Sequence, residues 1–229
     1  MTTAQLGILA SLWFTYCALH SLLATLELQR RFAARWPNWR PLYRLFYNGV
    51  AIILLLPPVL LTFAWRGPLL WEWRGIGAWL ADLLALAAGL GFLWTLRYYD
   101  LQAFLGLRQW RQGSQAGMAQ EPFYLSPMHR YVRHPWYFFS LVILWTRAMD
   151  PALLLASAMI TLYFVLGSRL EEGKLIVYYG DVYRRYRERV PALLPLPWRY
   201  LSQQEAAALL AGATQSRSHS HDVAATPPP

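Results

Sequence analysis

Long apolar stretches divide this sequence and place the strongest constraint on its fold. Three of them, at residues 6–26, 42–65 and 76–96, reach the roughly 20 residues that a helix needs to cross about 30 Å of hydrocarbon. A fourth, at residues 152–167, is slightly shorter. These lengths predict an all-α, polytopic membrane helix bundle.

A further apolar stretch, residues 136–149, ends at Asp150-Pro151, which is a turn signal. As a helix it would measure about 20 Å, too short to span comfortably. Arg147 near its end costs roughly 2.5–3.5 kcal/mol at a bilayer centre but little at an interface. We therefore expect residues 135–168 to form a tight helical hairpin, with Arg147 reaching toward headgroups, for about five transmembrane helices in all. A re-entrant pair that does not cross is the alternative.

The composition also favours a membrane protein. Apolar residues make up 56% of the chain and charged residues only 14%, less charge than a soluble surface of this size needs. The net charge of +9 ordinarily suggests nucleic acid, but the basic residues lie in the short gaps between apolar stretches. There they indicate topology and contacts with membrane lipids, so we expect no nucleic-acid partner. The single cysteine, Cys17, supplies neither an internal disulfide nor a metal cluster, and we expect no metal site.

Gaps rich and poor in basic residues alternate along the chain. The gap after the first stretch, the gap after the third and the segment after the last are rich, whereas the other gaps are sparse. With five crossings, the positive-inside rule places the N-terminus outside and the C-terminus in the cytoplasm. Residues 97–134 and the segment after residue 168 then share the cytoplasmic side.

The polar segments give the remaining organisation. The gap after the third stretch is expected as a polar loop around residues 108–117. After the last span, residues 169–179 read as an amphipathic cytoplasmic helix closed by Gly180, and Asp181 can cap a short helix to about Arg189. We expect a membrane domain at residues 1–202, followed at 203–229 by an Ala-rich segment and a disordered tail.

The first candidate cluster is Arg133-His134-Pro135, at the cytoplasmic start of the hairpin. The proline disfavours helix at His134 and fits the first turn of the helix that follows. A helix start offers free amide donors and a partial positive charge, and Arg133 adds a two-pronged cationic donor. An anionic ligand group could dock here. Alone, the cluster fits helix anchoring at headgroup level somewhat better.

The second candidate cluster follows the last span, where Glu171 and Glu172 stand side by side among basic residues. On a helix, Glu172, Tyr179 and Tyr183 fall on one face. An anchoring interpretation again remains open, because tyrosines form interfacial belts and Glu171 can pair with Lys174.

Taken together, the two clusters are more specific. An Arg-His-Pro-x-Tyr motif (residues 133–137), about thirty apolar residues with a central turn, a Glu-Glu pair and Val-Pro-x-Leu-Leu-Pro (190–195) form an ordered series. The series, within residues 124–197, resembles the isoprenylcysteine carboxyl methyltransferase and phospholipid methyltransferase superfamily. The N-terminal part, with Ala-Leu-His-Ser at 18–21, is more similar to bacterial members such as methanethiol S-methyltransferases.

The resemblance implies a helical membrane enzyme, here of the bacterial inner membrane, that takes S-adenosylmethionine from the cytoplasm. It implies that residues 124–197 bind the cofactor, and that Arg169 contacts the substrate. Glu172, Arg169 and His134 are the candidate catalytic residues. The candidate cofactor-binding residues are His129, Tyr131, Arg133, His134, Tyr137, Glu171 and Glu172.

Methyl transfer suits such a site because the cofactor already carries the activated group, so the protein mainly positions and desolvates. A carboxylate of the Glu pair can offset the cofactor's positive charge. If the acceptor is a thiol or an amine, a proton must leave, and His129 or His134 is available near pH 7. Prenylcysteine carboxylate, phospholipid amine and small thiol acceptors all remain open. A non-catalytic membrane protein, such as a small transporter or assembly factor, is the second hypothesis.

Overall fold

A computed structural model describes residues 1–113 and 123–212, and helices account for nearly all regular structure in this part of the chain. The chain divides into two compact units. One unit includes residues 1–113 and Ser140–Phe164, and the other includes residues 123–139 and 165–212. The expected disordered tail lies outside the described residues from 213 onward.

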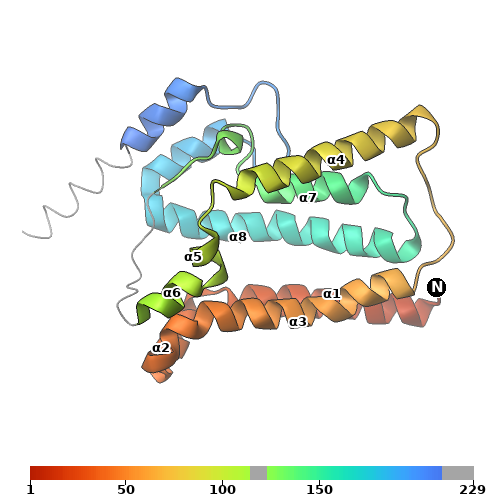
Figure 1. The fold of residues 1–229 in the computed structure, drawn as a ribbon, viewed down its shortest axis with the longest axis horizontal. Helices are drawn as coiled ribbons and strands as arrows, with labels where there is room; N and C mark the ends of the chain where they lie inside the picture. The colour runs from red at the N-terminus through yellow and green to blue at the C-terminus, as the bar shows by residue number, and fades with distance from the viewer. Residues whose placement is uncertain (114–122, 213–229) are drawn as a thin grey trace, which may run out of the picture. The chain divides into compact units, whose positions relative to one another are not determined.

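Four helices are long and apolar enough to cross a membrane: α1 (Thr3–Leu23), α3 (Tyr43–Ala64), α4 (Ile76–Leu96) and α8 (Pro151–Arg189). They match the four apolar stretches of the sequence, and the predicted all-α membrane bundle is confirmed. The expected fifth crossing is α7 (Pro135–Trp145), whose 11 residues make a helix of only about 16 Å. Figure 1 labels these helices along the chain.

Two local expectations need correction, and one gap contains a helix for which no expectation was stated. The last span continues into the amphipathic segment without interruption, because both belong to α8 (39 residues). The break in α8 comes at Gly180, where φ is 55°, as expected. The start of the expected polar loop is helical instead, in α5 (Leu101–Leu105) and α6 (Leu107–Gln112), while residues 114–122 lie outside the described part. Amphipathic α2 (Leu26–Arg35) occupies the first basic gap.

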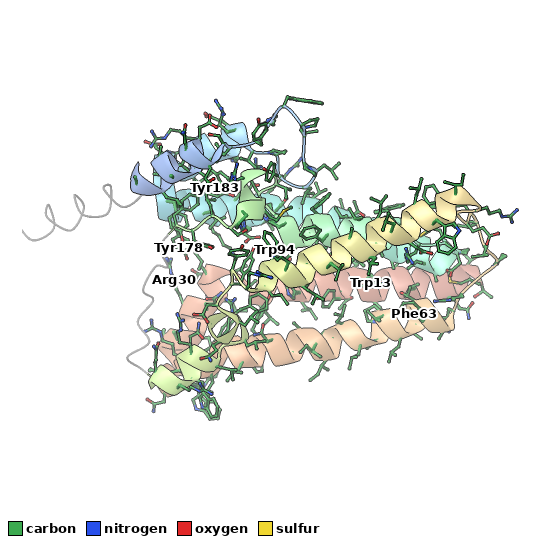
Figure 2. All side chains as sticks on the ribbon, turned by 45° about the horizontal axis from the view of Figure 1, so that its top comes forward. Trp13, Arg30, Phe63, Trp94, Tyr178 and Tyr183 are labelled. Carbon is green, nitrogen blue, oxygen red and sulfur yellow. The ribbon has the colours of Figure 1, made fainter. Side chains whose placement is uncertain are left out.

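Helices α1 and α3 lie side by side within the first unit (Figure 1). Trp13 (labelled in Figure 2) is 3% exposed, and its indole N–H donates to Thr62 Oγ1 at 3.2 Å. His20 lies between two tyrosines of neighbouring helices, with its Nε2 2.7 Å from the Tyr47 hydroxyl and its Nδ1 2.6 Å from the Tyr163 hydroxyl. These bonds satisfy polar groups that would be costly inside a bilayer.

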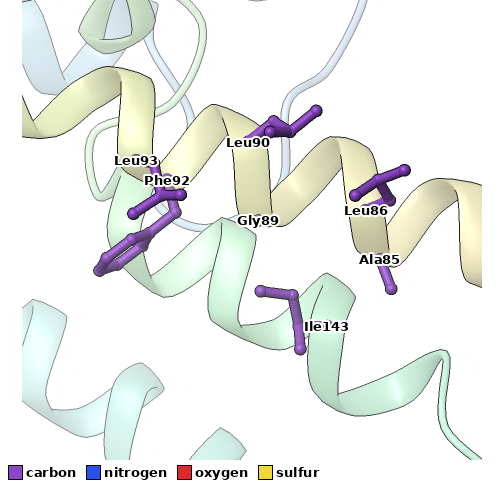
Figure 3. A pocket seen from close by; sticks show the side chains of 7 residues that line it. All are labelled: Ala85, Leu86, Gly89, Leu90, Phe92, Leu93 and Ile143. Carbon is purple, nitrogen blue, oxygen red and sulfur yellow. The ribbon is translucent and has the colours of Figure 1, made fainter.

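The surface of α4 is apolar and suited to lipid. Trp79 is 80% exposed and Leu83 61% exposed, so these side chains are available to acyl chains. Beside α7, α4 borders a shallow pocket of about 390 Å³ (Figure 3). This pocket is lined by Ala85, Leu86, Gly89, Leu90, Phe92, Leu93 and Ile143.

The turn between α7 and α8 is fixed by polar contacts. Asp150 Oδ1 accepts hydrogen bonds from the backbone N–H groups of Ala152 and Leu153, so the predicted Asp-Pro turn caps α8. Arg147, which we expect to reach toward headgroups, pairs with Asp82 of α4 at 3.0 Å. The pair offsets two charges that would be unfavourable beside hydrocarbon.

In the second unit, the part of α8 beyond Phe164 carries the aromatic core. Tyr183 (labelled in Figure 2) and Tyr186 are each 2% exposed and pack with Val190 and Leu201. Residues 203–212 form a further helix whose Ala206 joins this core. Leu175 and Ile176, which follow the Glu pair on α8, pack against this core.

Candidate active site

The Arg133-His134 turn is held by a distant segment of the chain. The backbone N–H of Arg133 donates to Pro191 O at 2.9 Å, and that of His134 donates to Ala192 O at 3.0 Å. Pro135, which has no N–H to lose, then begins α7. The Val-Pro-x-Leu-Leu-Pro segment therefore fixes the backbone from which both side chains project.

The Arg133 guanidinium is bound on all sides and is 9% exposed. Its Nε and Nη2 lie 2.8 Å and 2.7 Å from Glu172 Oε1. Its Nη1 donates to the carbonyl oxygens of Arg187, at 2.9 Å, and Val190. A planar cation with several divergent donors fits this arrangement, and a lysine would not.

His134 lies between the two carboxylates of the Glu pair. Its Nε2 is 3.1 Å from Glu172 Oε1, and its Nδ1 is 3.5 Å from Glu171 Oε2. Tyr137, one turn along α7, stacks on the imidazole at 5.2 Å between ring centroids. The Tyr137 hydroxyl donates to Glu171 Oε2 at 3.4 Å.

The pKa values in this cluster follow from burial and pairing. Burial opposes the charged form of His134, but the hydrogen bonds and charges of Glu171 and Glu172 outweigh it and raise the pKa of His134 above 6.5. Burial likewise opposes ionisation of the two carboxyls, yet the bonds to His134 and the charge of Arg133 lower the pKa of Glu172. The pKa of Glu171 is lowered too, chiefly by His134 against burial. The pairing therefore favours the charged forms of His134 and of both carboxyls.

The Glu pair retains capacity for a ligand. Three side-chain nitrogens, two of Arg133 and one of His134, converge on Glu172 Oε1, and no side chain of the described residues bonds to Oε2. Glu171 also remains half exposed. Each carboxylate can accept about four hydrogen bonds, so both can still hold a cationic ligand group.

The structure brings most of the predicted site residues together. Arg133, His134, Tyr137 and the two glutamates form one network, as described above. The Ser126 hydroxyl and backbone N–H bind His129 Nδ1, at 2.7 Å and 3.1 Å. Burial, followed by the charge of His134, lowers the pKa of His129 to about 4. Tyr131 lies outside the network: it is 41% exposed and stacks on Tyr200.

A cavity of about 430 Å³ borders Glu172, and Arg169 lies in its wall as an exposed side chain. Sequence reasoning missed several other residues of this wall, above all Arg187 and Arg199. They come from segments beyond the Glu pair, and no local spacing connects them to it. The lining is Arg133, Val165, Ser168, Arg169, Glu172, Arg187, Pro191, Ala192, Leu193 and Arg199.

Comparison with curated proteins finds relatives of one kind. Methanethiol S-methyltransferase 1 of Bradyrhizobium diazoefficiens is 31% identical over 191 residues, which cover 79% of this chain and 62% of the relative. Methanethiol S-methyltransferase 2 of the same organism is 30% identical over 189 residues, covering 77% of this chain and 68% of the relative. A methanethiol S-methyltransferase of Mycobacterium tuberculosis is 29% identical over 194 residues, covering 79% and 74%.

These similarities extend well beyond the third of the chain that carries the sequence motifs. No family model matches the chain, and no solved structure matches it either.

Proposed function

We propose that this chain, which belongs to the isoprenylcysteine carboxyl methyltransferase-like family together with the methanethiol S-methyltransferases, is a membrane enzyme that uses S-adenosylmethionine. Several relatives carry the name methyltransferase, and four helices have the length and composition of membrane spans. Because the chain spans 62% of the length of the first relative, its activity and its acceptor are proposals.

One observation carries the proposal. The Arg133-His134 turn and the Glu pair, about forty residues apart in sequence, meet in a buried network with contacts of 2.7–3.1 Å to Glu172 Oε1. Simple headgroup anchoring does not require an arginine and a histidine to converge on one buried carboxylate oxygen. A non-catalytic transporter or assembly factor gives no reason for this convergence.

The residues present fit S-adenosylmethionine. The cofactor combines an ammonium, a sulfonium and a carboxylate, and when bound it supplies a methyl group already activated for transfer. Glu172 Oε2 and the half-exposed Glu171 can hold the cationic part. Tyr137 holds Glu171, while Arg133 and His134 hold Glu172 in place. The protein's contribution is thus positioning and exclusion of water.

For the acceptor, we propose a small thiol. The relatives are named for methanethiol, and of the acceptors that the sequence left open a small thiol agrees with those names. A thiol can reach the site from the membrane or from water, because it is small and only weakly polar.

We further propose that the site faces the cytosol, with the N-terminus outside and the C-terminus inside. The alternation of basic residues along the gaps supports this orientation. In a variant with Cys17 replaced by serine, a membrane-impermeant maleimide added to intact cells should label cysteine placed at Arg74. It should not label cysteine placed at Arg185, and the reverse pattern would contradict the orientation.

The activity test is direct. Protein purified in detergent should transfer the isotope-labelled methyl group of S-adenosylmethionine to short alkanethiols, with the methyl thioether detected by gas chromatography. Glu172→Gln should lower kcat/KM at least tenfold, about 1.4 kcal/mol, because the carboxylate charge is removed from the network.

Glu188→Gln is the matched control, since Glu188 lies on the same helix with an exposed side chain outside the cavity lining. A folded parent that transfers no methyl group to any thiol would contradict the proposed acceptor. Equal activity of both variants and the parent would contradict the role of Glu172.

A further inference from the structure

The cavity beside Glu172 has an unusual charge distribution. Four arginines and one glutamate line it. Arg133 and Glu172 pair with each other at 2.7 Å, so their charges offset. Among the described residues, no carboxylate lies within ion-pair distance of Arg169, Arg187 or Arg199. The cavity therefore carries about three uncompensated positive charges.

One of these arginines is also held in position. Arg199 Nη2 donates to the backbone carbonyl of Glu188 at 2.6 Å, a bond that orients the guanidinium without neutralising it. The backbone carbonyl of Arg187 accepts a hydrogen bond from Arg133, and this bond fixes the backbone of Arg187 beside the network. The apolar part of the wall consists of Val165, Ala192 and Leu193. Cationic groups beside an apolar wall suit an anion that carries a hydrocarbon group.

The histidines near the network are poorly suited to remove a proton from an acceptor. Both nitrogens of His134 face carboxylates, at 3.1 Å and 3.5 Å, an arrangement that favours its protonated form. His129 Nδ1 is already bonded to Ser126, and burial lowers the pKa of His129 to about 4, so it is a weak base at neutral pH. An acceptor that binds as an anion needs neither of them.

Resting on the proposed function, we propose that this cavity binds the methyl acceptor as an anion, a thiolate, and that Arg169, Arg187 and Arg199 stabilise its charge. The S–H bond of the thiol ionises and the proton leaves to bulk water. The thiolate sulfur then forms a bond to the methyl carbon, while the bond from that carbon to the sulfonium sulfur breaks and its electron pair stays on that sulfur. The products are a methyl thioether and a neutral thioether of the spent donor.

The same charges discriminate between acceptor classes. A phospholipid amine in its cationic form would be repelled by three arginines, whereas thiolates and carboxylates would both be attracted. We favour the thiolate because a neighbouring guanidinium is known to promote thiol ionisation. The experiments below therefore also compare the binding of a carboxylate with that of a thiolate.

The test measures ionisation of a bound thiol without turnover. The probe is 7-mercapto-4-methylcoumarin, whose thiol and thiolate differ in absorbance, titrated over pH with detergent-purified protein and with protein-free micelles as reference. We expect the apparent pKa of the protein-bound probe to lie at least about one unit below that in micelles, a tenfold gain in thiolate at a given pH. Arg187→Gln and Arg199→Gln should each reverse part of this shift.

Two kinds of variant guard against misfolding. Arg187→Lys and Arg199→Lys keep the charge and should retain most of the pKa shift of the probe. Arg185→Gln removes an exposed arginine of the same helix outside the cavity lining and should leave the shift unchanged. An unshifted pKa in the folded parent, or equal shifts in Arg185→Gln and Arg187→Gln, would overturn the proposal.

Cofactor binding separates this proposal from the proposed function. Calorimetry with S-adenosylmethionine should give the same Kd, within about twofold, for the parent and the Arg187→Gln and Arg199→Gln variants. A tenfold loss would mean that these arginines hold the cofactor's own carboxylate, and it would overturn the acceptor assignment alone. No binding by the parent would overturn the proposed function, while the pKa shift of the probe would still report on the cavity. Tighter binding of butyrate than of the probe thiolate would point to a carboxylate acceptor and refute the choice of a thiolate.

Discussion

Replacing Arg133 by lysine tests how much the buried network depends on the shape of the guanidinium. Arginine reaches Glu172 Oε1 with two nitrogens, and with the third it reaches the carbonyl oxygens of Arg187 and Val190. Lysine keeps the charge, but its three donors share one nitrogen and cannot reach acceptors in such different directions. At least one carbonyl and part of the Glu172 pairing are lost in a site where Arg133 is only 9% exposed.

Each unsatisfied buried acceptor costs about 1–3 kcal/mol, and breaking a buried ion pair outright costs about 3–5 kcal/mol. Because lysine keeps its charge, we expect Arg133→Lys to lower the free energy of unfolding by about 3 kcal/mol. The measurement is a reversible denaturant titration in mixed micelles, followed by tryptophan fluorescence. Arg185→Lys, an exposed position on α8, should change the same quantity by less than about 0.5 kcal/mol. A loss below about 1 kcal/mol in Arg133→Lys would refute the reasoning.

Three further predictions concern pH, a hydroxyl and a glycine. The free energy of unfolding should be greatest near neutral pH. The pKa of His134 is raised, so its stabilising contribution is complete below pH 6.5 and is lost as pH rises through the raised value. The pKa of His129 is lowered, so its contribution is lost as pH falls from 6.5 to about 4. His134→Gln should flatten the alkaline limb of the stability profile. His129→Gln should flatten the acid limb above pH 4.5, while the loss of stability at lower pH, where Glu171 and Glu172 take up protons, should remain. An unchanged slope between pH 6.5 and 4.5 in His129→Gln, or an unchanged alkaline limb in His134→Gln, would contradict this assignment. The Tyr183 hydroxyl is buried and has no hydrogen-bond partner among the described residues, so Tyr183→Phe should raise the free energy of unfolding by about 1 kcal/mol. Tyr186→Phe, which removes a 2.7 Å bond to His129 O, should lower it by a similar amount, and a lower stability of both variants would contradict the contrast. Gly106→Ala should lower the thermal unfolding midpoint, because φ is +90° there and the added Cβ would lie 2.8 Å from the backbone nitrogen of Leu45. Gly113 also has a positive φ, but a Cβ there would meet no atom within 4 Å, so Gly113→Ala should lower the midpoint less. Equal shifts of the midpoint in the two variants would refute the steric clash at Gly106.

The spans were predictable because crossing a membrane requires long apolar runs, which local sequence displays directly. The helix break at Gly180 and the helix start at Pro135 were predictable for a similar reason, since each rests on the conformation of one residue type. The continuity of α8 through Arg169 was not, because a change in polarity at a membrane surface looks the same whether the helix continues or ends.

The family resemblance predicted that the Arg133-His134 turn meets the Glu pair. It did not predict the contacts that hold the turn in place, which the structure shows. The carbonyl oxygens of Pro191 and Ala192 bond the backbone of the turn from nearly sixty residues away. Contacts of this kind involve main-chain atoms, which every residue carries, so they leave no pattern in the sequence. The place of Arg199 in the cavity wall was not predictable either, because Arg199 belongs to a loop whose path depends on the folded core.

We propose that Glu172 is the carboxylate that Arg133 and His134 orient toward a cationic cofactor. Isothermal calorimetry of detergent-purified protein with S-adenosylmethionine measures this most directly, using the parent, Glu172→Gln and the exposed control Glu188→Gln. We predict binding by the parent and the control with equal Kd, and a Kd at least tenfold higher for Glu172→Gln, about 1.4 kcal/mol. Equal Kd for all three proteins, or no binding by a folded parent, would contradict the account.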